Sequence, residues 1–197
     1  MKAIKFFAAL FMLFAVSASV NAQELDKASQ KALKKQIKEL KSEGWKVNPG
    51  QLPLETQLTR AFKSQVDGEM ITGEGKSTGT VYDAAKTQAI TVAKTMLAGQ
   101  LRTDLTQSLK AELANQESST GDPISKAEAI VKMQGRSIDQ HLTRPKVLME
   151  CYRKLPDGKI EVQVTLGIPG DTLDKLTKAA MEQARQADFQ KKIDVVE

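Results

Sequence analysis

Residues 70–115 carry most of the information about the fold, and they read MITGEGKSTGTVYDAAKTQAITVAKTMLAGQLRTDLTQSLKAELAN. A short extended run, residues 70–72, leads into the glycine-rich residues 73–79. Glycine adopts turn conformations without steric cost, so this segment is typical of a turn. A helical pattern more than thirty residues long begins near Tyr82.

The helical pattern changes along its length. Alanines dominate the apolar positions of its first half, and leucines follow at every fourth position from Leu97 to Leu113. On a helix with about 3.6 residues per turn, a spacing of four advances the apolar face by about 40° at each step. We therefore expect the two halves of this helix to pack on different partners.

A β-hairpin with the clearest alternation in the chain comes later. Residues 147–151 and 160–168 both alternate between apolar and polar side chains, and Pro156-Asp157-Gly158 supplies the turn. This pattern predicts one apolar and one polar face. The hairpin and the Met70 strand together predict an α+β fold: a small antiparallel sheet of about three strands, with the long helix and further helices on one face.

The first residues read as a signal peptide, residues 1–22. Lys2 and Lys5 precede an apolar run over residues 6–16, and small residues stand at the cleavage positions before Ala22. This run is too short to span a bilayer, and no later apolar run is long enough. We expect cleavage near Ala22 and a periplasmic or secreted protein without a transmembrane span. The residue directly after Ala22 is Gln23 and not a cysteine, so the lipid-attachment signal of bacterial lipoproteins is missing.

The excess positive charge is confined to one segment of the mature chain. Residues 23–48 contain seven lysines and four acidic residues, whereas residues 49–197 contain 20 basic and 20 acidic residues. A nucleic-acid-binding domain would carry a basic face on its body, so we expect no nucleic-acid partner. We divide the mature chain into a Lys-rich amphipathic helical arm, residues 23–48, and a single α+β domain, residues 49–197.

The spacing of apolar residues in the arm predicts an amphipathic helix from Leu25 to Lys41, with leucine, isoleucine and alanine on one side. Such a helix can lie on an anionic membrane. Alternatively, its apolar side docks on the body and its lysines are solvated. The candidate partner-binding residues on the polar side are Lys27, Lys31, Lys34, Lys35, Lys38 and Lys41.

One catalytic motif is present. Residues 75–79 match G-x-S-x-G between a strand and a helix, which suggests a serine hydrolase with Ser77 as nucleophile and His141, the single histidine, as base. That arrangement belongs to folds with a large parallel sheet, and only about three strands are predicted here. A glycine-rich strand end is the competing interpretation. A single histidine and a single cysteine, Cys151, leave no metal-ligand cluster, and no cofactor motif is complete.

The order of these elements resembles a known family. A strand ending in Gly73-x-Gly75, a long helix with alanines leading into residues 97–101 (LAGQL), and the hairpin with its Asp157-Gly158 turn are similar to the LPP-twenty-like family of small envelope lipoproteins. The N-terminal domain of the flagellar protein FlgT looks similar. The Lys-rich arm and its proline-containing link also resemble exported proteins of Bacteroidetes-type bacteria. The family resemblance implies an α+β envelope domain without catalytic residues.

These observations favour a non-catalytic, exported cell-envelope protein that acts as a binding or structural module. Its expected partner is an envelope protein or an anionic envelope surface, met through the lysines of the arm. The serine hydrolase is the alternative.

Overall fold

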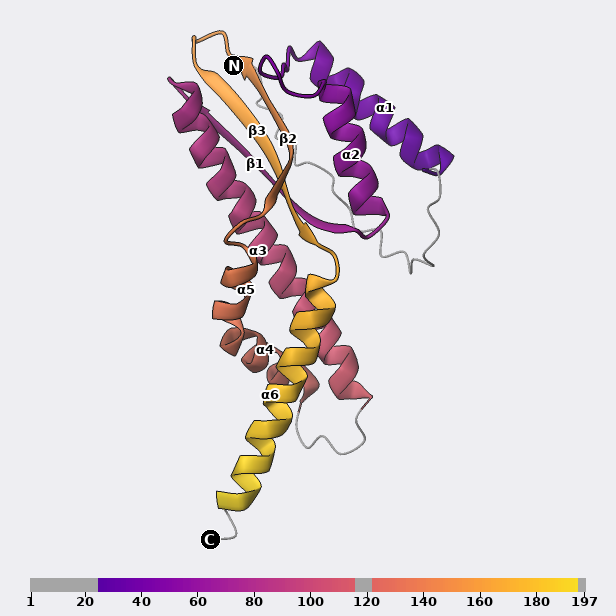
Figure 1. Cartoon of the computed structure of the whole chain (residues 1–197), viewed down its shortest axis with the longest axis vertical. Helices are drawn as coiled ribbons and strands as arrows, with labels where there is room; N and C mark the ends of the chain where they lie inside the picture. The colour runs from indigo at the N-terminus through magenta and orange to yellow at the C-terminus, as the bar shows by residue number, and fades with distance from the viewer. Residues whose placement is uncertain (1–24, 116–121, 195–197) are drawn as a thin grey trace, which may run out of the picture.

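The computed structural model describes residues 25–115 and 122–194, so the predicted signal peptide lies outside the described residues. Six helices and three strands make up this part of the chain (Figure 1). Their bounds are α1 Lys27–Ser42, α2 Leu54–Val66, β1 Met70–Gly79, α3 Tyr82–Ala114, α4 Pro123–Met133, α5 Gly135–His141, β2 Lys146–Lys154, β3 Ile160–Pro169 and α6 Thr172–Asp194.

The three strands form one antiparallel sheet in the order β1-β3-β2, and α3 packs along it. This confirms the predicted α+β class. The hairpin β2–β3 supplies the centre and one edge of the sheet, and β1 supplies the other edge. β1 is ten residues long and pairs with β3 in continuous register, from Met70 opposite Pro169 to Gly79 opposite Ile160.

The prediction of a turn over residues 73–79 is wrong, because all of these residues belong to β1. Its glycines serve close packing rather than chain reversal. A Cβ atom on Gly75 would lie 2.0 Å from the Ala89 carbonyl oxygen, and one on Gly73 would lie 2.6 Å from that of Ala93. Glycine in a strand marks such a close approach of another backbone. The strand and the helix therefore touch backbone to backbone.

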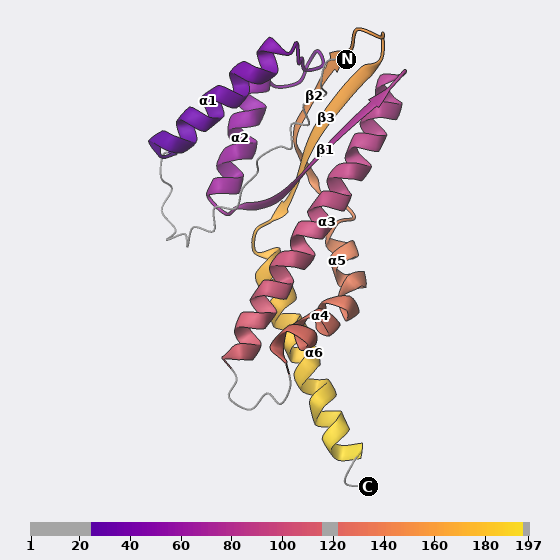
Figure 2. The same cartoon turned by 180° about the vertical axis from the view of Figure 1, so that it is seen from behind.

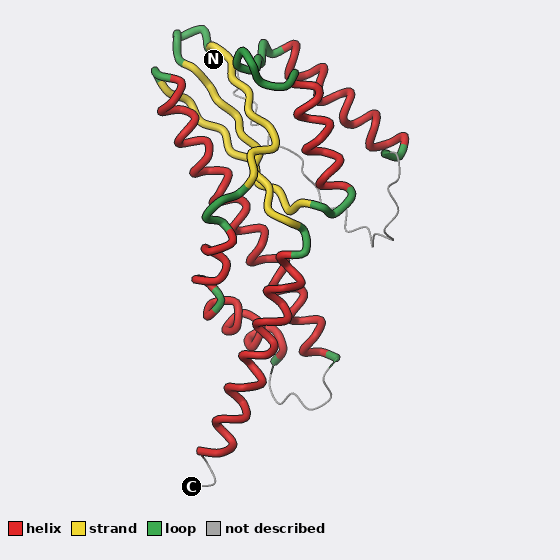
Figure 3. The backbone as a smooth tube through the Cα atoms, viewed as in Figure 1, coloured by secondary structure: helices red, strands yellow, loops and turns green. Residues whose placement is uncertain are grey.

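Helix α3 has 33 residues, and its two halves meet different partners, as predicted. Ala85, Ala89 and Ala93 are at most 1% exposed and lie against the sheet. The later leucines, Leu101 to Leu113, extend beyond the sheet among α4, α5 and α6 (Figures 1 and 3). The four-residue spacing carries the buried stripe around the helix and so allows this change of partner.

The hairpin has two apolar faces, and the prediction of a single apolar face is wrong. Val164 pairs with Glu150, whereas Cys151 pairs with Gln163, so the apolar residues of the two strands point to opposite sides. The turn between Lys154 and Ile160 sets this register, and a bulge between Val147 and Met149 changes it near the start of β2. Shifting register by one residue moves a whole apolar row to the other face.

The second apolar face is covered by α1 and α2, so the expectation that the long helix and the further helices of the domain share one face is wrong for α2. Val162, Val164, Leu166 and Ile168 of β3 pack with α3. On the other side, Met149 and Cys151 of β2 pack with α1, α2 and Trp45. Figures 1 and 2 show the resulting layers: α3, the sheet, then α2 and α1.

Replacing Gly75 with Ala tests the close contact between β1 and α3. The new methyl group would overlap the backbone of α3, which cannot move without displacing the whole helix, so we expect a loss of about 3 kcal/mol or more of unfolding free energy. Urea unfolding measures it. The matched control is Gly99→Ala within α3, where a Cβ atom meets nothing within 4 Å. That variant should gain up to about 1 kcal/mol, and equal effects of the two changes would contradict the contact.

Candidate functional site

The predicted arm is a helix whose apolar side is docked on the body. Asp26 caps α1 by accepting a hydrogen bond from the Ser29 backbone N–H at 2.7 Å. Leu33 and Leu40 are buried against α2 and β2. Ala28 and Ala32, two of the alanines predicted to lie on the apolar side of this helix, are exposed. The sequence left open whether this helix lies on a membrane or docks on the body, and in the structure it docks on the body.

Docking of α1 turns the six candidate lysines toward solvent, and all of them are exposed. Lys41 pairs with Glu55 of α2, and Lys35 lies 3.8 Å from Glu39. Among the described residues, the other four candidates form no ion pair: Lys27, Lys31, Lys34 and Lys38. Their charge is thus available to a partner.

Trp45 fastens the end of the arm to the sheet. The residue is 4% exposed, and two cations lie near its ring: the Arg153 guanidinium is 4.8 Å and the Lys76 ammonium 5.0 Å from the ring centroid. The indole N–H donates to Glu43 at 3.0 Å. Lys46 then exchanges two backbone hydrogen bonds of 2.8 Å with Tyr152, so the arm pairs with the outer edge of β2.

A buried carboxylate lies beside this junction. Glu150 is 5% exposed and accepts hydrogen bonds from the Tyr82 hydroxyl and from the Lys86 ammonium, the latter at 2.9 Å. Asn48 donates to Tyr82 at 2.6 Å, and Gln51 donates to Glu150 at 3.3 Å. The cluster therefore ties α3 and the α1–α2 connection to β2.

The electrostatics of this cluster keep its charges fixed near neutral pH. Burial raises the pKa of Glu150, but hydrogen bonds from Tyr82 and Lys86 outweigh burial and leave the pKa below its ordinary value. Burial and the bond to Glu150 raise the pKa of Tyr82 well above its ordinary range. A general acid or base works best with a pKa near the operating pH, and neither group meets this condition. The arrangement suits a structural tie.

Sequence reasoning missed Glu150. Its signal was a glutamate inside an otherwise apolar strand segment, between Met149 and Cys151. Charged side chains are rarely buried without a partner, so this position could have prompted a search for one. The partners themselves, Tyr82 and Lys86, lie more than sixty residues earlier in the chain and carry no local sign of the contact.

Replacing Tyr82 with Phe tests the tie. The variant removes one hydrogen bond to a buried carboxylate, so we expect a loss of about 1–3 kcal/mol of unfolding free energy, measured by urea unfolding. The matched control is Tyr152→Phe, which alters a neighbouring ring packed edge-on at 5.5 Å from Tyr82. The Tyr152 hydroxyl makes no hydrogen bond within the described residues, so this control should stay close to the parent protein.

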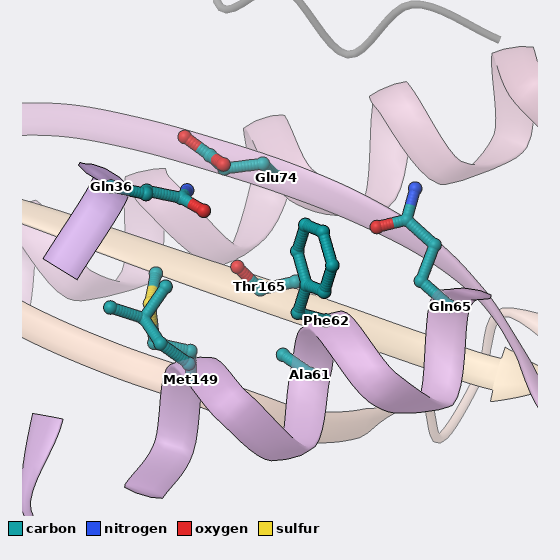
Figure 4. A pocket seen from close by; sticks show the side chains of 8 residues that line it. Gln36, Ala61, Phe62, Gln65, Glu74, Met149 and Thr165 are labelled. Carbon is teal, nitrogen blue, oxygen red and sulfur yellow. The ribbon is translucent and has the colours of Figure 1, made fainter. Parts of the chain in front are cut away.

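The described surface has one small pocket and one wider hollow. A pocket between α1, α2 and β1 has a volume of about 20 Å³, and Figure 4 shows Glu74, Phe62 and Met149 around it. A wider, open depression of about 490 Å³ lies between α2 and the start of β2. Its lining includes three basic side chains: Arg60, Lys63 and Lys146.

Glu74 is the titratable group of the small pocket. Burial raises its pKa above the ordinary value of 4.5, and the nearby Lys76 opposes that effect. Its carboxylate accepts a hydrogen bond of 2.8 Å from the Gln163 amide. The Gln163 side-chain oxygen is buried and has no hydrogen-bond partner. An ionised Glu74 cannot donate a proton to it, so the pair is incomplete near neutral pH.

Replacing Glu74 with Gln should complete the pair, because an amide both accepts from and donates to Gln163. We expect about 1 kcal/mol of added stability at pH 7. Since the folded-state pKa of Glu74 is raised, the parent loses stability as pH rises from about 4.5 through that pKa. The advantage of the variant should therefore vanish below pH 4.5. Thermal unfolding across this pH range measures it, and an advantage independent of pH would contradict the assignment.

The structure does not bring together the residues of the hydrolase alternative. Ser77 lies inside β1 opposite Val162, not on a turn. His141 ends α5, which leads to β2 at Lys146, opposite Gly167. Val162 and Gly167 are five positions apart on β3, or about 17 Å at about 3.3 Å per residue. Ser77 and His141 therefore belong to opposite ends of the sheet.

The described residues also show no reactive thiol and no cluster of metal ligands. Burial raises the pKa of Cys151 to about 12, so its thiol stays protonated and packs as a small apolar group. Within residues 25–115 and 122–194, no three His, Cys, Asp or Glu side chains gather as metal ligands. The same residues include no helix long and apolar enough to cross a membrane.

No protein-family model and no curated protein matches this chain. The resemblance to the LPP-twenty-like family therefore stays a prediction.

Proposed function

We propose that the protein is a non-catalytic binding or structural module of the cell envelope, exported by its signal peptide. The docked α1 helix carries this proposal: its apolar side packs against α2 and β2, and its six lysines are all exposed to solvent. A helix held in this way presents its charges in a fixed row. We place the contact with an envelope protein or an anionic envelope surface on this row.

Two further observations support a role in binding rather than in catalysis. The buried groups Glu150 and Tyr82 are held in single charge states near neutral pH, so they suit structure better than proton transfer. The formal charge of residues 49–197 is zero, so residues 23–48 supply the net attraction to an anionic surface. The resemblance to LPP-twenty-like proteins points to the same compartment.

Neutralising lysines tests the proposal without disturbing the fold. Deleting the arm would instead uncover Met149 and Cys151, because Leu33, Leu40 and Trp45 cover them. The test variant changes three unpaired lysines to glutamine: Lys31, Lys34 and Lys38. The control variant changes three exposed lysines of the body, with the same change in net charge: Lys132, Lys154 and Lys178.

We expect the parent and the control to sediment with envelope fractions and with phosphatidylglycerol vesicles at low salt, and the test variant to remain in solution. Added salt should release the parent, because contacts between exposed charges are screened beyond about 8 Å at physiological ionic strength. Equal binding by the test and control variants would show that the lysine row does not make the contact, and would contradict the proposal. Binding to envelope fractions but not to lipid vesicles would identify the partner as an envelope protein.

A further inference from the structure

The two edges of the sheet are treated differently. The β2 edge carries a bulge after Val147, pairs with Lys46, and has the Glu150 backbone N–H bound by the Gln57 side chain at 2.8 Å. The β1 edge has ten residues in unbroken register, without proline or bulge. No strand or bridge among the described residues pairs with its outer side. Proteins usually protect such an edge, since it is ready to pair with another strand.

The backbone groups that this edge offers follow from the register. The Gly170 N–H donates to the Glu69 carbonyl at 2.8 Å, so Glu69 occupies a position that bonds to β3. Antiparallel pairs alternate between bonded and non-bonded positions. Alternate residues therefore direct their N–H and C=O groups away from β3. They are Met70, Thr72, Glu74, Lys76 and Thr78.

Helix α3 flanks the same edge with apolar side chains. On a helical wheel, Lys86 and Ile90 lie to one side of the line through Ala89 and Ala93, and Val92 and Met96 lie to the other. Lys86 reaches Glu150 of β2, so its side faces the interior of the sheet. The opposite side therefore faces past β1. There Val92 is half-buried and Met96 is 59% exposed.

We propose that the β1 edge binds a second copy of this chain, which forms a two-fold dimer with one continuous six-stranded sheet. Antiparallel pairing about Gly75 places Glu74 opposite Lys76 of the second copy, and Thr72 opposite Thr78. Both pairs fall on residues that direct their backbone groups outward, so Thr72, Glu74, Lys76 and Thr78 all have hydrogen-bonded partners, whereas Met70 lies opposite Thr80, beyond the end of β1. Opposite charges and paired threonines are favourable cross-strand neighbours. The strand is thus complementary to itself.

The position of α3 is consistent with the same two-fold axis through Gly75. A Cβ on Gly75 would meet the Ala89 carbonyl and the Ala93 N–H, so Gly75 lies at the level of residues 89–93 of α3. A two-fold axis through Gly75 therefore brings the two α3 helices together, antiparallel, near Val92. Val92 then meets its own counterpart, and Met96 meets Gln88 of the second copy. Two small residues, Gly73 and Gly75, let α3 lie close beneath the edge strand.

The other layer lies mainly over the far edge of the sheet, and its side chains reach β1 at the small pocket beside Glu74. Helix α2 packs on Met149 and Cys151 of β2, which is the far edge of the sheet. Figures 1 and 2 show α1 stacked outside α2, on the face opposite α3. The dimer would therefore carry both lysine rows on one face and the paired α3 helices on the other.

Light scattering on the mature protein over a wide concentration range tests the dimer. The test variant is Met96→Glu, which places a charge in the seam between the α3 helices at a position that is exposed in a single copy. The matched control is Met133→Glu, at a residue 66% exposed at the end of α4. A dimeric parent, a dimeric control and a monomeric test variant, all with unchanged circular dichroism, are the expected result.

Hydrogen exchange assigns the interface to β1. The outward amides of Thr72, Glu74 and Lys76 should exchange slowly in the parent and rapidly in the Met96→Glu variant. A parent that stays monomeric at all concentrations would overturn the proposal. A dimer that survives Met96→Glu, or that leaves these three amides unprotected, would place the interface elsewhere and overturn it equally.

Discussion

The fold depends on the backbone contact between β1 and the first half of α3. Gly73 and Gly75 carry no side chain, and Ala89 and Ala93 carry only a methyl group, so strand and helix approach more closely than larger residues would allow. Dispersion contacts are individually weak, but they accumulate along such a continuous interface. This contact fixes β1 as an edge strand and aims the rest of α3 beyond the sheet. There its leucines form a core with α4 and α6.

A second constraint is the register of the β2–β3 hairpin. Because Cys151 pairs with Gln163 and Val164 with Glu150, the sheet is apolar on both faces and must be covered twice. α3 covers one face, and the N-terminal arm with α2 covers the other. The lysine row owes its fixed position to this requirement. The proposed contact surface and the structural cover are therefore the two sides of one helix.

The sequence predicted the features that depend on local patterns, but not those that depend on contacts between distant segments. The four-residue apolar spacing predicted α3 and its change of partner, and the alternation of β2 and β3 predicted the hairpin. Residues 73–79 misled because glycine serves turns and close packing alike, and only the alanines of α3 distinguish the two uses. The faces of β2 depended on a turn and a bulge that alternation does not reveal. The lysine candidates were found from periodicity, whereas the partners of Glu150 come from distant segments.

The most direct test of the central contact is native-state hydrogen exchange of the amides that β1 directs toward β3. If the glycine–alanine contact fixes the fold, the amides of Gly73, Gly75 and Ser77 should exchange only through global unfolding, with the same free energy as Ala89 and Ala93 in α3. Exchange of these β1 amides through a separate opening of much lower free energy would show that α3 and the hairpin hold together without the edge strand. That result would contradict the account.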